Sequence, residues 1–128
     1  MSARLPFLYI RAIEGKGRGV FTAQEIPAGS AIESCPVLVL PAEDTERIHQ
    51  TTLHDYYFLW GTTGESAIAL GFGSLYNHAS AANADYAMDI AGQSIEITAL
   101  RDIAAGEEIT INYMEGGEQR SALWFKEA

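Results

Sequence analysis

The sequence predicts a mostly β fold of several small sheets with few short helices. Short runs of β-branched and aromatic residues recur along the chain, and clusters of Gly, Pro, Asn and Asp separate them. This pattern is typical of proteins that are built from short strands and tight turns. The run SIEITAL also alternates, with Ile95, Ile97 and Ala99 on one face, as expected of a half-buried strand.

The sequence predicts two helices, one hairpin turn and eight strands. A helix is predicted over 41–57, where acidic residues follow Pro41 in the first turn. A short amphipathic helix is predicted within the stretch 116–128, after Gly116 and Gly117. A hairpin turn is predicted at 91–93, between the predicted strands 84–90 and 94–100. The predicted strands are 7–10, 19–23, 31–40, 56–60, 66–70, 84–90, 94–100 and 108–113.

One octapeptide pattern occurs twice. Residues 25–32 read EIPAGSAI and residues 102–109 read DIAAGEEI, so both follow acidic–Ile–x–Ala–Gly–x–x–Ile. The glycine permits a positive φ between two strands, and we therefore predict two similar corners at Gly29 and Gly106. Two copies are too few for a solenoid.

Length and composition limit the class of protein. The 128 residues form one predicted domain, 1–128, with a single core. No apolar run approaches the roughly 20 residues of a membrane span, and the N-terminus lacks the features of a secretory leader. We therefore expect an intracellular protein without membrane contact, located either in a bacterial cytoplasm or, as the protein of a virus or parasite, in a eukaryotic nucleus. The net charge of −9 repels nucleic-acid phosphates and favours a basic partner, although acidic surfaces also serve solubility alone.

Metal and nucleophile chemistry find little support. Cys35 is the only cysteine, which excludes an intrachain disulfide and a cysteine-built zinc site, and we expect it to be a buried small apolar residue. His49 and His54 do not share a helix face, and His78 has no His or Cys nearby in the sequence. No nucleophile elbow G-x-S-x-G is present. No metal site is predicted.

Three motifs remain as candidates for a functional site. The first is EGKGRGVFT at 14–22, which fits neither a P-loop nor a dinucleotide-binding fingerprint because its glycines lead straight into a strand. Its backbone can approach a ligand closely, and Lys16 and Arg18 add positive charge. The alternative is a flexible turn with solvated bases.

The other two motifs lie in the second half of the chain. In GFGSLYNHASAANADY, residues 71–86, Asn77 and His78 offer hydrogen-bond donors and acceptors just after a glycine-rich turn. A lone histidine is more often a structural residue. In GEEITINYMEGG, residues 106–117, Tyr113 ends a strand, and the alternative is a ring in the core with its hydroxyl in water.

In this order the three motifs resemble the SET-domain protein lysine methyltransferases, most of all the very small, free-standing members from viruses and bacteria. The resemblance covers about residues 7–115 and leaves about 114–128 as a C-terminal lid or tail. It implies a SET fold with a C-terminal pseudoknot, S-adenosylmethionine as cofactor, and a homodimer. The implied substrate is a lysine in a basic protein tail, histone-like or ribosomal.

The resemblance also implies particular site residues. Tyr113 matches the catalytic tyrosine, and Tyr56 matches a second tyrosine of the lysine channel. Asn77 and His78 match the pair that holds the amine and the adenine of the cofactor. The implied cofactor-binding residues are Lys16, Gly17, Arg18, Asn77, His78 and Tyr113. The implied channel residues are Tyr56, Ser74, Leu75, Tyr76 and Trp124.

Two further expectations concern the surroundings of the channel. Gly71 and Gly73 are expected to let the backbone of the Asn-His turn approach the cofactor. Tyr57, Tyr76 and Tyr86 are candidates for narrowing the channel, which would limit the number of methyl groups added.

The chain departs from larger relatives in two ways. It reads N-H-A-S-A-A-N where they read N-H-S-C-x-P-N, and it lacks their cysteine-rich flanking modules. Residues 114–125, with the aromatic Trp124 and Phe125, are the candidates for closing the channel, either over the chain's own site or over a neighbour's. The alternative function is a non-catalytic SET-like module that binds a basic peptide or the cofactor without turnover.

Overall fold

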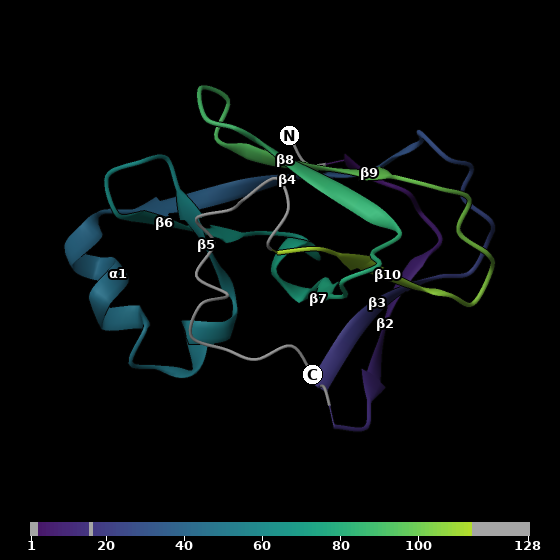
Figure 1. Cartoon of the computed structure of the whole chain (residues 1–128), viewed down its shortest axis with the longest axis horizontal. Coiled ribbons are helices and arrows are strands. Elements are labelled where there is room, and N and C mark those ends of the chain that lie inside the picture. Colours follow the sequence, from purple (N-terminus) through teal and green to yellow (C-terminus); the bar gives the residue numbers. More distant parts are fainter. Residues whose placement is uncertain (1–2, 16, 114–128) are drawn as a thin grey trace.

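The computed structural model describes residues 3–15 and 17–113 of the chain. These residues form two sheets with little helix (Figure 1). The larger sheet has the strand order β5-β6-β4-β9-β8, with β1 added beside β4, and all its neighbouring strands are antiparallel. Its strands are β1 (Ala3–Arg4), β4 (Ala31–Leu40), β5 (Tyr57–Trp60), β6 (Glu65–Ala69), β8 (Ala84–Asp89) and β9 (Ser94–Ala99).

The smaller sheet joins segments from both halves of the chain. Its order is β2-β3-β10-β7, and its strands are β2 (Leu8–Ile13), β3 (Gly17–Thr22), β10 (Glu108–Ile111) and β7 (Asn77–His78). β10 runs antiparallel to β3 but parallel to β7, with Thr110 opposite Asn77 and Ile111 opposite His78. Two segments that are far apart in the sequence therefore meet in the middle of the molecule (Figure 1), as the predicted pseudoknot requires.

All the predicted strands are confirmed, although several of their ends differ by a few residues. Ile95, Ile97 and Ala99 in β9 are 0%, 1% and 3% exposed, so the alternation in the sequence marks the core-facing side. The turn at 91–93 is confirmed as well, and the Gln93 N–H closes it by donating to the Ile90 carbonyl, one residue after β8 ends. β1 and β7 are not predicted because two-residue strands are too short to carry a period.

The predicted helix over 41–57 is wrong in extent. The α-helix α1 spans Ala42–Ile48, and a separate 3-10 helix, η1, spans Thr52–Asp55. The break lies at Thr51, whose hydroxyl donates to the Ile48 carbonyl at 2.6 Å and accepts from the Leu53 N–H at 3.1 Å. A side chain that binds the backbone on both sides competes with a continued helix. The helix predicted near the C-terminus lies outside the described residues.

The two similar corners are confirmed. Gly29 and Gly106 have φ values of 85° and 86°, in the left-handed region that glycine tolerates. The corners also pair with each other, because Ile26 and Ile103 exchange two backbone hydrogen bonds of 2.9 and 2.8 Å. Both isoleucines are buried. The repeated pattern therefore makes one long-range contact that joins the two halves of the chain.

Glu107, in the second corner, is expected to make stability depend on acid pH. The Ala104 N–H and the Arg101 guanidinium, both at 2.9 Å, donate to its carboxylate, and they lower the pKa of Glu107 below its ordinary value of 4.5. A lowered folded-state pKa contributes stability above pH 4.5, which is lost as the pH falls through the folded-state value. Thermal melts of wild type and Glu107→Gln should therefore differ at neutral pH and converge in acid.

The exposed Glu14 provides a matched control for this experiment. Glu14→Gln removes the same charge from a side chain that makes no hydrogen bond with another described residue. Its melting temperature should follow that of the wild type across the acid range. A constant difference between wild type and Glu107→Gln at every pH would contradict the role of the Glu107 carboxylate.

Cys35 is fully buried, as expected of a structural residue. Burial and the neighbouring Glu33 carboxylate raise the pKa of its thiol well above the usual range, so the reactive thiolate is disfavoured at neutral pH. No helix within 3–15 and 17–113 is long and apolar enough to cross a bilayer. The same residues hold no group of three or more His, Cys, Asp or Glu side chains arranged to bind a metal ion.

Candidate active site

The candidate site forms where β3, β7 and β10 lie side by side (Figure 1). Asn77 of β7 is at its centre, because its side-chain amide donates to the Arg18 carbonyl at 3.1 Å and to Glu108 Oε2 at 2.8 Å. Arg18 belongs to the first glycine motif and Glu108 to the C-terminal motif. One side chain therefore links all three motifs. Both amide N–H groups are used in this way, which leaves the amide oxygen for a different partner.

Gly19 allows these segments to lie so close together. A β-carbon at this position would be 2.6 Å from Glu108 Oε2 and 2.9 Å from Asn77 Nδ2. Both distances are far below the roughly 3.5 Å of an ordinary non-bonded contact, so a side chain here would displace the Asn77 amide and the Glu108 carboxylate from their contact. The first motif is thus more than a flexible turn, because one of its glycines is required for packing against Asn77.

His78 and Tyr113 contact each other through backbone and ring. The Tyr113 N–H donates to His78 Nδ1 at 3.0 Å, and the two ring centroids are 5.1 Å apart. A ring nitrogen that accepts a hydrogen bond carries no proton, so this contact selects the tautomer with its proton on Nε2. His78 therefore fixes the backbone at Tyr113, two residues after β10 ends.

The Tyr113 hydroxyl points back to the turn that precedes β7. It donates to the Tyr76 carbonyl at 2.8 Å, and the two residues are 9% and 1% exposed. The alternative of a hydroxyl in water is therefore wrong for Tyr113. The Tyr113 phenol and the Tyr76 carbonyl instead form a hydrogen bond that is almost completely shielded from solvent. This bond lies directly beside β7, the strand of Asn77 and His78.

The turn itself contains the short 3-10 helix η2 (Gly73–Leu75). A β-carbon on Gly71 would collide with the Glu33 carboxylate, and one on Gly73 would lie 2.9 Å from Cys35 Sγ. These glycines let the turn pack against β4. Their part in the approach to a cofactor stays a prediction. Ser74 also serves the turn, because its hydroxyl accepts a hydrogen bond of 3.0 Å from the end of β6.

The hydroxyls of the three tyrosines expected to narrow a channel all have partners within the chain. The Tyr57 hydroxyl lies 3.3 Å from His49 Nδ1, and the Tyr86 hydroxyl donates to the Tyr113 carbonyl at 3.4 Å. The Tyr76 hydroxyl donates at 2.7 Å to a buried carboxylate on β4. These contacts give each ring a structural role, and narrowing of a channel stays a prediction.

Several predicted site residues are only partly accounted for. Tyr56 is 37% exposed immediately before β5, and no hydrogen bond joins its hydroxyl to another described residue, so its role as a channel tyrosine stays a prediction. Leu75 packs against the hydrophobic core, and Gly17 begins β3. Lys16 and Trp124, with the rest of the predicted lid, lie outside the described residues.

Sequence reasoning does not identify Glu33 and Glu108. Glu33, Cys35 and Val37 lie two residues apart on the same face of β4, and all three are buried. A charged residue at a core-facing position of a predicted strand could therefore have identified Glu33. Glu108 is distinguished only by its contact with Asn77, and no local pattern encodes that contact.

Comparison with known proteins gives three findings. Residues 17–114 match the family described as SET domain. The chain is 39% identical over 121 residues to a histone-lysine N-methyltransferase of Schizosaccharomyces pombe named as H3 lysine-37 specific, a match that covers 94% of this chain and 78% of that protein. It also resembles the crystal structure of a Plasmodium falciparum protein provisionally named a histone methyltransferase, with a TM-score of 0.70 and 27% identity over 93% of this chain and 96% of the other.

Proposed function

Because the chain belongs to the SET-domain family and is a protein-lysine N-methyltransferase, we propose that it methylates a lysine in a basic protein tail with S-adenosylmethionine as the methyl donor. The observation that carries the proposal is the buried contact of 2.8 Å between the Tyr113 hydroxyl and the Tyr76 carbonyl. It lies beside the strand of Asn77 and His78, the two residues proposed to hold the cofactor.

The residues around Asn77 suit this cofactor chemically. S-adenosylmethionine carries an ammonium group, and the amide oxygen of Asn77 is an acceptor that no described residue uses. The Glu108 carboxylate adds negative charge 2.8 Å from the same side chain, which favours a cationic ligand. We propose that the backbone of Gly17 and Arg18, with the charge of Lys16, binds the carboxylate end.

The chain's own residues would then prepare the target lysine. When bound, the cofactor supplies a methyl group on a positively charged sulfur. The lysine must be neutral to react, and although its reference pKa is about 10.4, desolvation next to a cation favours loss of its proton. We propose that the Tyr113 hydroxyl and the Tyr76 carbonyl orient the amine and exclude water. No histidine or carboxylate has to act as a general base.

A histone-like or ribosomal tail is the proposed substrate. The Schizosaccharomyces pombe relative is named for a lysine of histone H3, and the net charge of −9 attracts a lysine-rich and arginine-rich segment over a long range. Such proteins are intracellular, and we propose the same location for this chain. The acidic surface also disfavours direct binding of nucleic acid.

The function is tested by a labelled-methyl assay. The protein is incubated with methyl-labelled S-adenosylmethionine and either purified core histones or ribosomal proteins, and label is expected on lysine in one of the two sets. Calorimetry with S-adenosylhomocysteine reports cofactor binding separately. Binding of the cofactor without any labelled protein would favour a non-catalytic module, and no binding at all would contradict the cofactor assignment.

A homodimer is proposed from the resemblance to the small, free-standing members of the family. Light scattering at micromolar concentration is expected to give about twice the 13.9 kDa of one chain. A monomeric mass under these conditions would contradict the proposal. The measurement also decides whether a partner chain is available to close the channel.

A further inference from the structure

We propose that Glu33 is a positioning residue for methyl transfer, which acts through Tyr76 to hold the carbonyl that faces the Tyr113 hydroxyl. The inference rests on the proposed function for its kinetic consequences. Its structural part stands on contacts between described residues and is measurable without turnover.

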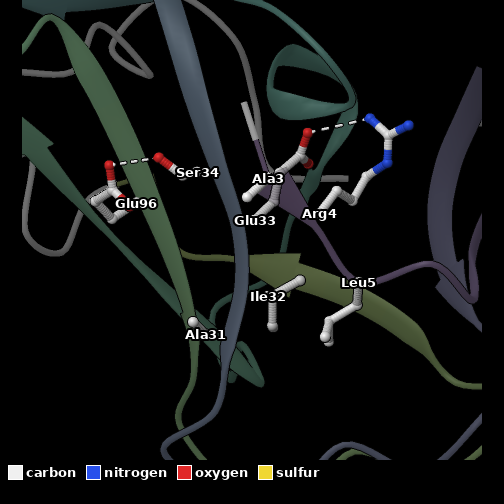
Figure 2. Close-up of a pocket in the computed structure, with 8 residues that line it drawn as sticks. All are labelled: Ala3, Arg4, Leu5, Ala31, Ile32, Glu33, Ser34 and Glu96. Atoms are coloured by element: carbon white, nitrogen blue, oxygen red, sulfur yellow. Dashed lines mark hydrogen bonds and ion pairs between the residues drawn. The ribbon is translucent and has the colours of Figure 1, made fainter. Parts of the chain in front are cut away.

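Glu33 is a fully buried acid on β4. Its side chain has no exposed surface. Both carboxylate oxygens have partners, since Oε1 accepts from the Tyr76 hydroxyl at 2.7 Å and Oε2 accepts from the Phe72 N–H at 3.0 Å. Arg4 of β1 adds an ion pair of 3.3 Å to Oε2 (Figure 2). A buried carboxylate is costly unless it is paired in this way.

These contacts hold the turn before β7 at both ends. The Phe72 N–H lies at its start and the Tyr76 side chain at its finish, and both bind the same carboxylate. Gly71, next to Phe72, has room only for a hydrogen against this group. The Tyr76 carbonyl, which accepts the Tyr113 hydroxyl at 2.8 Å, therefore belongs to a residue whose ring is fixed from the opposite side.

A merely space-filling role does not require an acid at this position. A buried hydrophobic residue of similar size often serves stability as well as a buried charge, but only a carboxylate can accept from an amide, a phenol and a guanidinium together. Burial and the Glu33 carboxylate raise the pKa of Tyr76 well above its usual range, so its hydroxyl stays a donor under all assay conditions. Fixing the carbonyl matters because displacement of a reacting group by about 1 Å can cost roughly 100-fold in rate.

The test compares Glu33→Gln, Tyr76→Phe and the double variant with the wild type. Each single variant is expected to lower kcat by about 30-fold, equivalent to about 2 kcal/mol at 1.36 kcal/mol per tenfold, while the affinity for S-adenosylhomocysteine and the KM for the protein substrate change little. The double variant should lose no more than either single variant, because Tyr76→Phe removes the contact that Glu33→Gln weakens by replacing a charged acceptor with a neutral one. In a Tyr113→Phe background, Glu33→Gln should have little further effect.

Glu96→Gln is the matched control. Glu96 lies on the adjacent strand β9, where its carboxylate accepts hydrogen bonds from Ser34 (Figure 2) and from Ser94. The change therefore removes the same charge nearby. Its activity should equal that of the wild type.

A readout without turnover separates this inference from the proposed function. With ring-labelled tyrosine, the Tyr113 Cζ resonance, assigned from Tyr113→Phe, is expected to shift in Glu33→Gln and Tyr76→Phe but not in Glu96→Gln. An unchanged resonance and an unchanged kcat in folded Glu33→Gln would overturn the inference, as would additive losses in the double variant. If Glu33→Gln does not fold, Tyr76→Phe, which removes only a hydroxyl, gives the same decision. A wild type that methylates nothing would reject the proposed function, and the resonance would still decide the role of Glu33.

Discussion

Tyr113→Phe is expected to lower kcat for methyl transfer by about 100-fold or more, as the loss of one preorganised donor does at other buried reaction centres. Binding of S-adenosylhomocysteine should be nearly unchanged. The reason is geometric, because the variant keeps the ring that packs on His78 but loses the hydroxyl that donates to the Tyr76 carbonyl. Initial rates with labelled cofactor and calorimetry with S-adenosylhomocysteine measure the two effects separately.

Tyr9→Phe is the control with the same chemical change. Tyr9 stacks on Phe21 with ring centroids 5.7 Å apart in the pair β2–β3, and the Tyr113 hydroxyl donates to Tyr76 instead. Loss of one neutral hydrogen bond costs only about 1 kcal/mol of stability, so both variants should give the circular dichroism spectrum of the wild type. Equal rates for Tyr113→Phe and wild type would remove Tyr113 from the mechanism.

The strands could be predicted because their signal is local. Alternation in β9 follows directly from the packing of Ile95 and Ile97 on one side of the sheet, and turn residues delimit the runs. The two corners at Gly29 and Gly106 were predictable for the same reason. The prediction of one helix over 41–57 was wrong because the Thr51 hydroxyl forms hydrogen bonds with backbone groups on both sides of it. These bonds compete with the backbone hydrogen bonds of a continuous helix.

The site could be predicted only in part. The order of the motifs identifies Asn77, His78 and Tyr113 as residues that share a site, and the parallel pairing of β7 with β10 brings them together. The contacts that hold these residues in place cannot be predicted from a periodic pattern in the sequence. Glu108 reaches Asn77 from the neighbouring strand β10, and Glu33 reaches Tyr76 from a strand of the other sheet, so both contacts depend on the tertiary fold.

Asn77→Asp is expected to weaken binding of S-adenosylhomocysteine by about 100-fold. The change removes the donors to the Arg18 carbonyl and to Glu108, and hydrogen bonds that involve a charged group contribute about 1.5–3 kcal/mol each. It also places a second carboxylate about where the amide nitrogen lay, 2.8 Å from Glu108 Oε2. Two carboxylates at that distance repel each other and open the contact between β7 and β10. Calorimetry at neutral pH measures the loss.

Acidification separates the two causes of this loss. When two carboxylates share a site, one of them takes up a proton well above its ordinary pKa, and the repulsion then becomes a hydrogen bond. Asn77→Asp should therefore regain part of its affinity as the pH is lowered from 7.5 to about 5.5, whereas Asn77→Ala, which lacks the second charge, should not. Gln50→Glu, which adds one negative charge at an exposed position after α1, should bind like the wild type at both pH values. If Asn77→Ala regained affinity in acid, or if Asn77→Asp regained none, the carboxylates of residues 77 and 108 would not be in contact. Asn77 would then not link β3 to β10 in solution.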